Sequence, residues 1–259
     1  MRSKVSTAVF LIGIIGENLN MKKQVEKTGK LSVRDLQAML NKKAGMNIVH
    51  SLKEDNPTEV KQWIPTGSTW LDSIICRGKK TGLPVGKVIE LAGEEATGKS
   101  YMAAQIAVNA QKMGITPVYL DSESSISPEF LEKMGCDLDD FLYVQAVSVE
   151  KTLELIEDLL KTGDQQFLFI WDSMALTPTT SDIEGDFNPQ SSMAVKPRIL
   201  SKGLSKLIIP IAQSQSTLLI LNQLKLNIGA DGNPKYMTQS QKFFTPGGKA
   251  LAYAYSLRI

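Results

Sequence analysis

Metal-binding and disulfide-forming side chains are scarce in this sequence. Its 259 residues include one histidine and two cysteines, Cys76 and Cys136, which lie far apart and in no C-x-x-C pair. A single histidine excludes a multi-histidine metal site, and two separate cysteines can build neither a zinc ribbon nor a disulfide-rich scaffold. The composition therefore indicates a reducing compartment, and we expect a cytoplasmic protein.

Long hydrophobic runs are also lacking. Residues 8–16 are apolar, but this run is far shorter than the roughly 20 residues that cross a bilayer. It resembles the core of a secretory signal, yet no small-x-small cleavage site follows it. A second methionine, Met21, begins a lysine-rich stretch. We interpret residues 1–20 as an upstream extension, with translation starting at Met21 rather than at Met1, and expect a soluble protein without a membrane partner.

Charge of either sign is nearly balanced over the whole chain, at a formal net charge of +2. Its distribution is uneven, because residues 121–186 contain sixteen acidic and three basic side chains. Residues 21–62 contain nine basic and five acidic side chains, and residues 224–249 contain four and one. A polyanion would avoid the middle segment and could contact the two flanks. The same charge distribution would also arise if these segments were ordinary solvent-exposed faces of the protein.

Hydrophobic spacing separates a small lobe from a larger core. Residues 31–40 carry apolar side chains at near-helical spacing behind Ser32, a candidate N-cap. Residues 53–58 are polar and turn-rich, which is typical of a boundary. We therefore expect a small basic helical lobe over residues 21–62 and a core over residues 63–259.

From residue 88 onward, apolar runs alternate with amphipathic helical patterns. Runs without polar alternation are typical of parallel strands that are covered on both faces. Each run ends in a polar residue, and open α/β sheets bind ligands at that carboxyl edge. The sequence predicts an α/β fold with a mainly parallel central sheet flanked by helices, with strands at 88–92, 117–120, 167–171 and 218–221 and helices at 101–113 and 148–160.

The segment between the first of these strands and its helix has the pattern G-x-x-x-x-G-K-S. Its glycines let the backbone wrap a phosphate with several N–H groups pointing inward. The lysine adds a cation for the β- and γ-phosphates, and the serine hydroxyl can coordinate Mg²⁺. A structural turn is the alternative, but the position between strand and helix is the context that the motif requires. The residues are Gly93, Glu94, Glu95, Ala96, Thr97, Gly98, Lys99 and Ser100.

Polar residues at three other strand ends are further candidates. Asp172 can hold Mg²⁺ through water beside the loop. Asp121 or Glu123 could orient and deprotonate an attacking water, and spacing does not decide between them. Gln223 offers a neutral amide that can hydrogen bond to a γ-phosphate. Each of these residues could instead be an ordinary loop residue.

With these motifs in this order, residues 64–259 resemble the bacterial RecA-type recombinases and their phage-encoded relatives. The phosphate loop is shared by many NTPases, whereas the order of IEG, N-Q-x-K-x-x-I-G and T-x-G-G-x-A-L is specific. The matching segments are IPTGS (64–68), GLP (82–84), GEEATGKS (93–100), YLDSE (119–123), FIWDS (169–173), IEG (183–185), LNQLKLNIG (221–229) and TPGGKAL (245–251).

The resemblance implies a RecA-like P-loop core with ATP and Mg²⁺ as cofactors. It assigns catalysis to Glu123, with Lys99 and Gln223, and it makes Asp172 the second Mg²⁺-associated acid. Gln223 would couple the γ-phosphate to a DNA-binding loop. Phe130 falls where the family has a tyrosine that stacks on adenine, and a plain core aromatic is the alternative for this position.

Two DNA-binding loops are implied, at residues 182–191 and 224–246. The first contains Glu184 and Gly185. The glycines and prolines of the second predict that it forms no regular element. Basic and aromatic residues on such a loop suit single-stranded DNA, through phosphate neutralisation and base contacts. In the second loop these residues are Lys225, Lys235, Tyr236, Lys242, Phe243 and Phe244.

The chain also departs from the family pattern. The second loop is several residues longer than usual. Pro197, Gly203 and Pro210 interrupt the helix expected over residues 193–212, which predicts a shorter or kinked helix. The sequence ends at Ile259, before the family's last core strands and the two lysines that reach a neighbouring subunit's ATP. We therefore expect either a fragment or a protein whose remaining part is supplied in trans.

The resemblance implies an ATP-dependent DNA recombinase with DNA-dependent ATPase activity. Such a protein assembles into a helical filament on single-stranded DNA and pairs it with homologous duplex, in DNA repair and in the SOS response to DNA damage. The alternative is a nucleotide-binding module without useful turnover that caps or regulates the filament of a complete recombinase. A hexameric helicase is disfavoured, because the IEG and G-G-x-A-L segments do not belong to that class.

Overall fold

The computed structural model describes residues 31–45, 47–52, 59–79, 81–124, 126–185, 195–226 and 243–259. Contacts within the chain divide it into two units, Met1–Glu59 and Val60–Ile259. Each unit is described by itself. Residues 1–20, interpreted from the sequence as an extension, lie outside the described residues.

The first unit contains helix α2 (Val33–Ala44). The Ser32 hydroxyl accepts a hydrogen bond from the Asp35 N–H at 3.2 Å, which confirms the predicted N-cap. Gly45 closes the helix in the left-handed conformation, at φ 69°. No side chain within this helix is buried, and its apolar residues, Val33, Leu36, Met39 and Leu40, are exposed. The helix therefore has an apolar face that the other described residues of its unit leave exposed.

The second unit is built on a six-stranded parallel sheet with strand order β10-β3-β7-β6-β4-β5. The four predicted strands are confirmed as β3, β4, β6 and β7, and they form the centre of the sheet. Two short strands, β5 and β10, form the edges of the sheet, and β5 was not predicted. The bounds are β3 (Val88–Gly93), β4 (Thr116–Asp121), β5 (Leu142–Gln145), β6 (Phe167–Asp172), β7 (Thr217–Gln223) and β10 (Leu257–Arg258).

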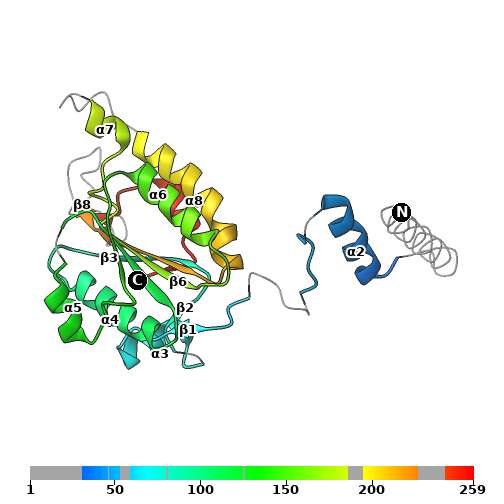
Figure 1. Cartoon of the computed structure of the whole chain (residues 1–259), viewed down its shortest axis with the longest axis horizontal. Helices are drawn as coiled ribbons and strands as arrows, with labels where there is room; N and C mark the ends of the chain where they lie inside the picture. Colours follow the sequence, from blue (N-terminus) through cyan, green and yellow to red (C-terminus); the bar gives the residue numbers. More distant parts are fainter. Residues whose placement is uncertain are drawn as a thin grey trace, which may run out of the picture. The chain divides into compact units, whose positions relative to one another are not determined.

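Helices cover both faces of this sheet, as Figure 1 shows. Strand residues alternate between two buried clusters, so that Ile170 and Leu219 face one cluster while Phe169 and Leu218 face the other. This alternation confirms the predicted α/β architecture with apolar strands buried on both sides. One face carries α3 (Thr69–Cys76), α4 (Lys99–Gln111) and α5 (Pro128–Met134), and the other carries α6 (Val149–Leu160), α8 (Val195–Gln213) and α10 (Lys249–Ala254).

Two antiparallel strand pairs and one short helix lie around this core. Strands β1 (Trp63–Ile64) and β2 (Leu83–Pro84) pair antiparallel. Strands β8 (Lys225–Leu226) and β9 (Phe243–Phe244) form a second antiparallel pair. Helix α7 (Thr180–Glu184) begins with a capping box, in which Thr179 and Asp182 hydrogen bond reciprocally.

The sequence predicts that helix α8 is shorter or kinked, and the shortening is wrong. It runs unbroken over 19 residues with Pro210 inside it. Pro197 lies in the first turn, where an N–H has no intrahelical partner to lose. A Cβ on Gly203 would lie 2.4 Å from Leu153 Cδ1, so glycine permits the close approach of α6 and α8. Pro197 and Gly203, two of the three residues that suggested an interruption, therefore suit their positions.

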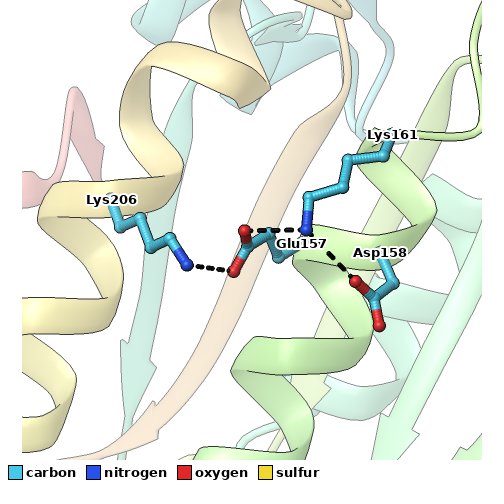
Figure 2. Close-up of polar contacts among 4 residues, drawn as sticks. All are labelled: Glu157, Asp158, Lys161 and Lys206. Carbon is cyan, nitrogen blue, oxygen red and sulfur yellow. Dashed lines mark hydrogen bonds and ion pairs between the residues drawn. The ribbon is translucent and has the colours of Figure 1, made fainter.

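Four charged side chains join α6 to α8 at the surface (Figure 2). Glu157 accepts from Lys161 of its own helix at 2.8 Å and from Lys206 of α8. Lys161 also pairs with Asp158 at 3.3 Å. The hydrogen bonds from Lys161 and then Lys206 lower the pKa of the Glu157 carboxyl. Such exposed pairs add little stability, so packing at Gly203 is the main reason for the close contact.

Within the described ranges, no helix combines the length and the apolar character that spanning a bilayer requires.

Candidate functional site

The glycine-rich segment forms an exposed loop between β3 and α4. Gly98 is the N-cap of the 13-residue helix α4 at φ 89°, a conformation that favours glycine. A Cβ on Gly93 would lie 2.7 Å from the Thr97 hydroxyl, so this position also requires glycine. Residues 94–98 are all exposed. The first-turn N–H groups of α4 therefore adjoin an open loop that can receive an anion.

Lys99 folds back over this loop. Its Nζ donates to the carbonyl oxygens of Gly93, at 3.1 Å, and Glu94, at 2.6 Å. The ammonium group of Lys99 thus lies beside the loop backbone and donates to carbonyl oxygens. Phosphate oxygens could take the place of these carbonyl oxygens as acceptors. This position fits the predicted role of a cation for phosphate.

Ser100 and Asp172 meet across the edge of the sheet. The Ser100 hydroxyl donates to Asp172 Oδ2 at 2.7 Å. Hydroxyl and carboxylate oxygens are hard ligands that suit Mg²⁺, which usually keeps several waters and takes few protein ligands. Among the described residues, no three His, Cys, Asp or Glu side chains gather as a metal cluster. The donor set therefore fits Mg²⁺ that is shared with phosphate oxygens rather than a metal held by protein alone.

Tyr119 is a third member of this cluster, and the sequence analysis missed it. Its hydroxyl donates to the same Asp172 oxygen at 2.6 Å, and its side chain is fully buried in β4. Burial, followed by the neighbouring Asp172 carboxylate, raises the pKa of Tyr119 far above its ordinary value. An aromatic residue inside a strand is typical of the core, so no sequence signal pointed to this contact.

Asp121 and Glu123, which spacing could not distinguish, differ in burial at the end of β4. Asp121 is fully buried, where it accepts from the Glu123 N–H at 2.9 Å and the Tyr143 hydroxyl at 3.3 Å. Glu123 is exposed. Asp121 therefore acts as a structural acceptor for the turn, whereas Glu123 presents its carboxylate to solvent.

Ser122 fixes the turn of β4 against the end of β6. Its hydroxyl donates to the Ser173 carbonyl at 2.8 Å, and its N–H donates to the Asp172 carbonyl at 2.8 Å. The peptide bond between Asp172 and Ser173 is cis. Because Asp121 and Asp172 are register partners, these bonds hold both carboxylate-bearing strand ends at one edge of the sheet.

Gln223 ends β7 directly opposite Gly93, its register partner in β3. The next residue, Leu224, donates its N–H to the Gly93 carbonyl at 3.0 Å. The first residue of the second candidate loop is thus bonded to the first residue of the phosphate loop.

Asn222 anchors the far end of the second candidate loop, residues 224–246, and this role was not predicted from the sequence. Its side-chain amide donates to the Pro246 carbonyl at 3.0 Å and to Glu90 Oε1 at 2.9 Å. Asn222 and Glu90 are both fully buried, and Arg258 Nε lies 2.8 Å from Glu90 Oε2. Both ends of the segment 224–246 are therefore attached at the tip of β7.

The candidate DNA-binding residues are only partly described. Glu184 and Gly185 are exposed at the end of α7, and Lys225 and Phe244 are exposed on β8 and β9. Phe243 is half-buried. The prediction that residues 224–246 form no regular element is wrong at the two ends, because Lys225 pairs with Phe244 and Leu226 with Phe243. Lys235, Tyr236 and Lys242 lie outside the described residues.

Phe130 is half-buried on α5 and packs against the core cluster that includes α4. Its ring centroid lies 6.2 Å from that of Tyr101, the residue after Ser100. This packing agrees with the reading of a core aromatic. The contact also brings Phe130 beside the first turn of α4.

Lys196, in the first turn of α8, is a further residue that sequence reasoning missed. Its Nζ donates to the Ala175 carbonyl at 2.6 Å. Burial lowers the pKa of this ammonium to about 8, with Asp182 opposing the shift and Lys225 adding to it. The side chain links the segment after β6 to the helix between the two candidate loops.

The site combines a central parallel strand, an exposed glycine-rich loop, an open helix N-terminus and a hydroxyl–carboxylate pair. These features define a protein of the P-loop class. The family model described as RecA N-terminal domain matches residues 32–259, and the chain belongs to this family. The RecA proteins of Fusobacterium nucleatum and Streptomyces avermitilis are similar, at 32% identity over 238 residues and 33% over 223. These alignments cover 92% and 86% of this chain but 60% and 55% of the relatives. The chain thus spans little more than half the length of these curated relatives.

Proposed function

We propose that this chain is the ATP-binding and DNA-binding core of a DNA recombinase. It binds ATP with Mg²⁺, assembles on single-stranded DNA and promotes pairing with homologous duplex. The observation that carries the proposal is the hydrogen bond between the Gly93 carbonyl and the Leu224 N–H. This bond connects the phosphate loop to the candidate DNA loop through backbone alone, so a ligand at one can bias the other.

The nucleotide would lie on the loop from Gly93 to Ser100. Lys99 exchanges its carbonyl partners for phosphate oxygens, and Ser100 and Asp172 hold Mg²⁺ directly or through water. When bound, Mg²⁺ neutralises charge on the phosphates. Phe130 offers a ring face to the base beside the first turn of α4.

Hydrolysis requires a base and a reporter of the γ-phosphate. Glu123 is the stronger candidate base, because its carboxylate is exposed whereas Asp121 is buried within its own turn. Gln223 would report the γ-phosphate. This role is supported by its register pairing with Gly93 and by its position directly before the second loop.

Single-stranded DNA would bind at the two loops. Lys225, Lys235 and Lys242 neutralise phosphates, and Tyr236, Phe243 and Phe244 offer faces for base contacts. Glu184 and Gly185 belong to the first loop.

Self-association is supported by two complementary surfaces. A groove of about 570 Å³ lies between the edge strand β5 and helix α6, lined by Val144, Val147, Leu155 and Leu159 with Glu154 and Asp158 among its acidic residues. Helix α2 has an exposed apolar face and basic residues in its last turn. We propose that α2 of one copy occupies this groove on the next copy, as a repeating contact would require in a filament.

The decisive experiment measures ATP hydrolysis by the full chain with and without single-stranded DNA. DNA-stimulated phosphate release is expected. Tight nucleotide binding without DNA-stimulated release would reject the recombinase ATPase and favour a nucleotide-binding regulator of another filament.

A further inference from the structure

Asp172 receives two hydroxyl donors on one oxygen atom. The Ser100 hydroxyl lies 2.7 Å and the Tyr119 hydroxyl 2.6 Å from Asp172 Oδ2. Ser100 is half-buried at the helix N-terminus, beside the open phosphate loop. Tyr119 approaches from the interior, in the strand next to the one that ends in Asp172. The two donors therefore differ in their access to a ligand.

The Tyr119 side chain has little freedom to move. It is fully buried, and its ring stacks on that of Phe141 at a centroid distance of 6.3 Å and an interplanar angle of 25°. The hydroxyl is thus a fixed donor, whereas a serine hydroxyl can rotate toward a new partner.

We propose that Tyr119 is a positioning residue that holds the Asp172 carboxylate in place when the Ser100 hydroxyl leaves it for Mg²⁺. Because both donors share Oδ2, the loss of one still leaves the carboxylate oriented by the other. A buried carboxylate without such a donor would reorient and accept metal-bound water less well. This inference rests on the proposed function, since it assumes a Mg²⁺–nucleotide at Ser100 and Asp172.

The chemistry of metal sites supports a measurable effect. Residues that hydrogen bond to a metal-associated carboxylate typically change metal affinity by about 10–100-fold when they are removed. Here the carboxylate is expected to contact Mg²⁺ through water, so an effect near the lower limit is expected. Phenylalanine fills the space of the tyrosine ring, and the substitution Tyr119→Phe therefore removes the hydroxyl alone.

The test measures binding of a fluorescent, non-hydrolysable ATP analogue to the full chain across a Mg²⁺ titration. For Tyr119→Phe we expect the half-saturating Mg²⁺ concentration to rise about 10-fold, with analogue affinity restored at high Mg²⁺. Tyr255→Phe is the matched control, because it likewise removes only a tyrosine hydroxyl, from a partly buried side chain near Glu90 rather than Asp172. Its Mg²⁺ midpoint should equal that of the wild type.

The outcomes separate this inference from the proposed function. Wild-type protein that binds the analogue without any Mg²⁺ dependence would overturn both. A normal wild-type titration with an unchanged Tyr119→Phe midpoint would overturn only the role of Tyr119. If Tyr119→Phe does not unfold cooperatively, it is not properly folded. The test is then NMR of the wild-type protein with ¹³Cζ-labelled tyrosine. The Tyr119 signal should then shift with Mg²⁺ and analogue together, and a constant signal would refute the inference.

Discussion

Gly203 of α8 faces Leu153 of α6 so closely that a Cβ on the glycine would lie 2.4 Å from Leu153 Cδ1. Leu153 is buried in the cluster beneath these helices. The two helices therefore approach one another at a position where no larger residue fits without movement of the leucine or of the backbone.

Gly203→Ala should consequently destabilise the core, although alanine favours helix by up to about 1 kcal/mol. Overpacking of this kind typically costs about 1–3 kcal/mol, so we expect a net loss of free energy of unfolding in urea denaturation. The double variant with Leu153→Ala provides the control, because the smaller side chain removes the clash. A Gly203→Ala protein as stable as the wild type would show that the leucine moves aside at no cost.

Lys99→Ala should abolish measurable ATP binding, because it removes the only lysine whose ammonium lies over the loop carbonyls in the described part of the chain. Equilibrium binding of a fluorescent ATP analogue tests this expectation. Lys112→Ala, which alters an exposed lysine at the opposite end of α4, should bind normally. Tight binding by Lys99→Ala would disprove the phosphate site.

Replacing Lys225, Lys235 and Lys242 together by alanine should weaken binding to single-stranded DNA. If all three neutralise phosphates, the slope of log affinity against log salt should fall in magnitude by about 2. Fluorescence anisotropy across a salt series measures this slope. The matched control replaces Lys112, Lys133 and Lys161, three exposed lysines outside both candidate loops. An identical slope in both variants would remove the loop from the DNA site.

A charge on the exposed face of α2 should prevent self-association. Leu36→Asp introduces a carboxylate where the helix offers apolar contact to the groove between β5 and α6, which is lined largely by apolar side chains. Light scattering with DNA and ATP should report smaller assemblies for this variant. Ala38→Asp adds the same charge away from the line of Val33, Leu36 and Leu40, and should assemble normally. Equal assembly by both variants would exclude α2 from the contact.

Lys196 should make stability depend on pH. Its pKa is about 8 in the folded protein and 10.5 ordinarily, so the unfolded chain binds more protons between these values. Stability should therefore rise with pH in that window. The rise should be on the order of 1 kcal/mol or less, because solvent screens the partly buried ammonium. Urea unfolding at pH 7.5 and 9.5 should show a smaller rise for Lys196→Met than for wild type, and parallel changes would contradict the assignment.

The central strands could be predicted because each is a continuous apolar run. Strand β5 escaped prediction because it is short and largely exposed, so that its sequence carries no burial signal. The expected shortening of α8 was wrong because local propensity could not anticipate the contact between Gly203 and Leu153. Tertiary packing thus overrode local preference at that position.

The candidate site could also be predicted only in part. The spacing G-x-x-x-x-G-K-S located the loop between strand and helix, since the motif is local. The choice between Asp121 and Glu123 depends on which side chain is buried, and the spacing of residues does not show burial. The hydroxyl of Tyr119 in β4 reaches Asp172 at the end of the neighbouring strand β6, and a contact between residues so far apart in sequence could not be predicted from a local pattern. The catalytic and DNA-contacting roles remain predictions.

The paired anchors of residues 224–246 have a consequence for how this segment can vary. Leu224 is bonded to Gly93 and Pro246 to Asn222, so the two junctions are fixed by the sheet rather than by whatever lies between them. Doubling the length of a closed chain segment costs only about 0.6 kcal/mol. Insertions and deletions between these junctions should therefore be tolerated by the fold, which leaves natural variation and engineering free to alter reach and composition there.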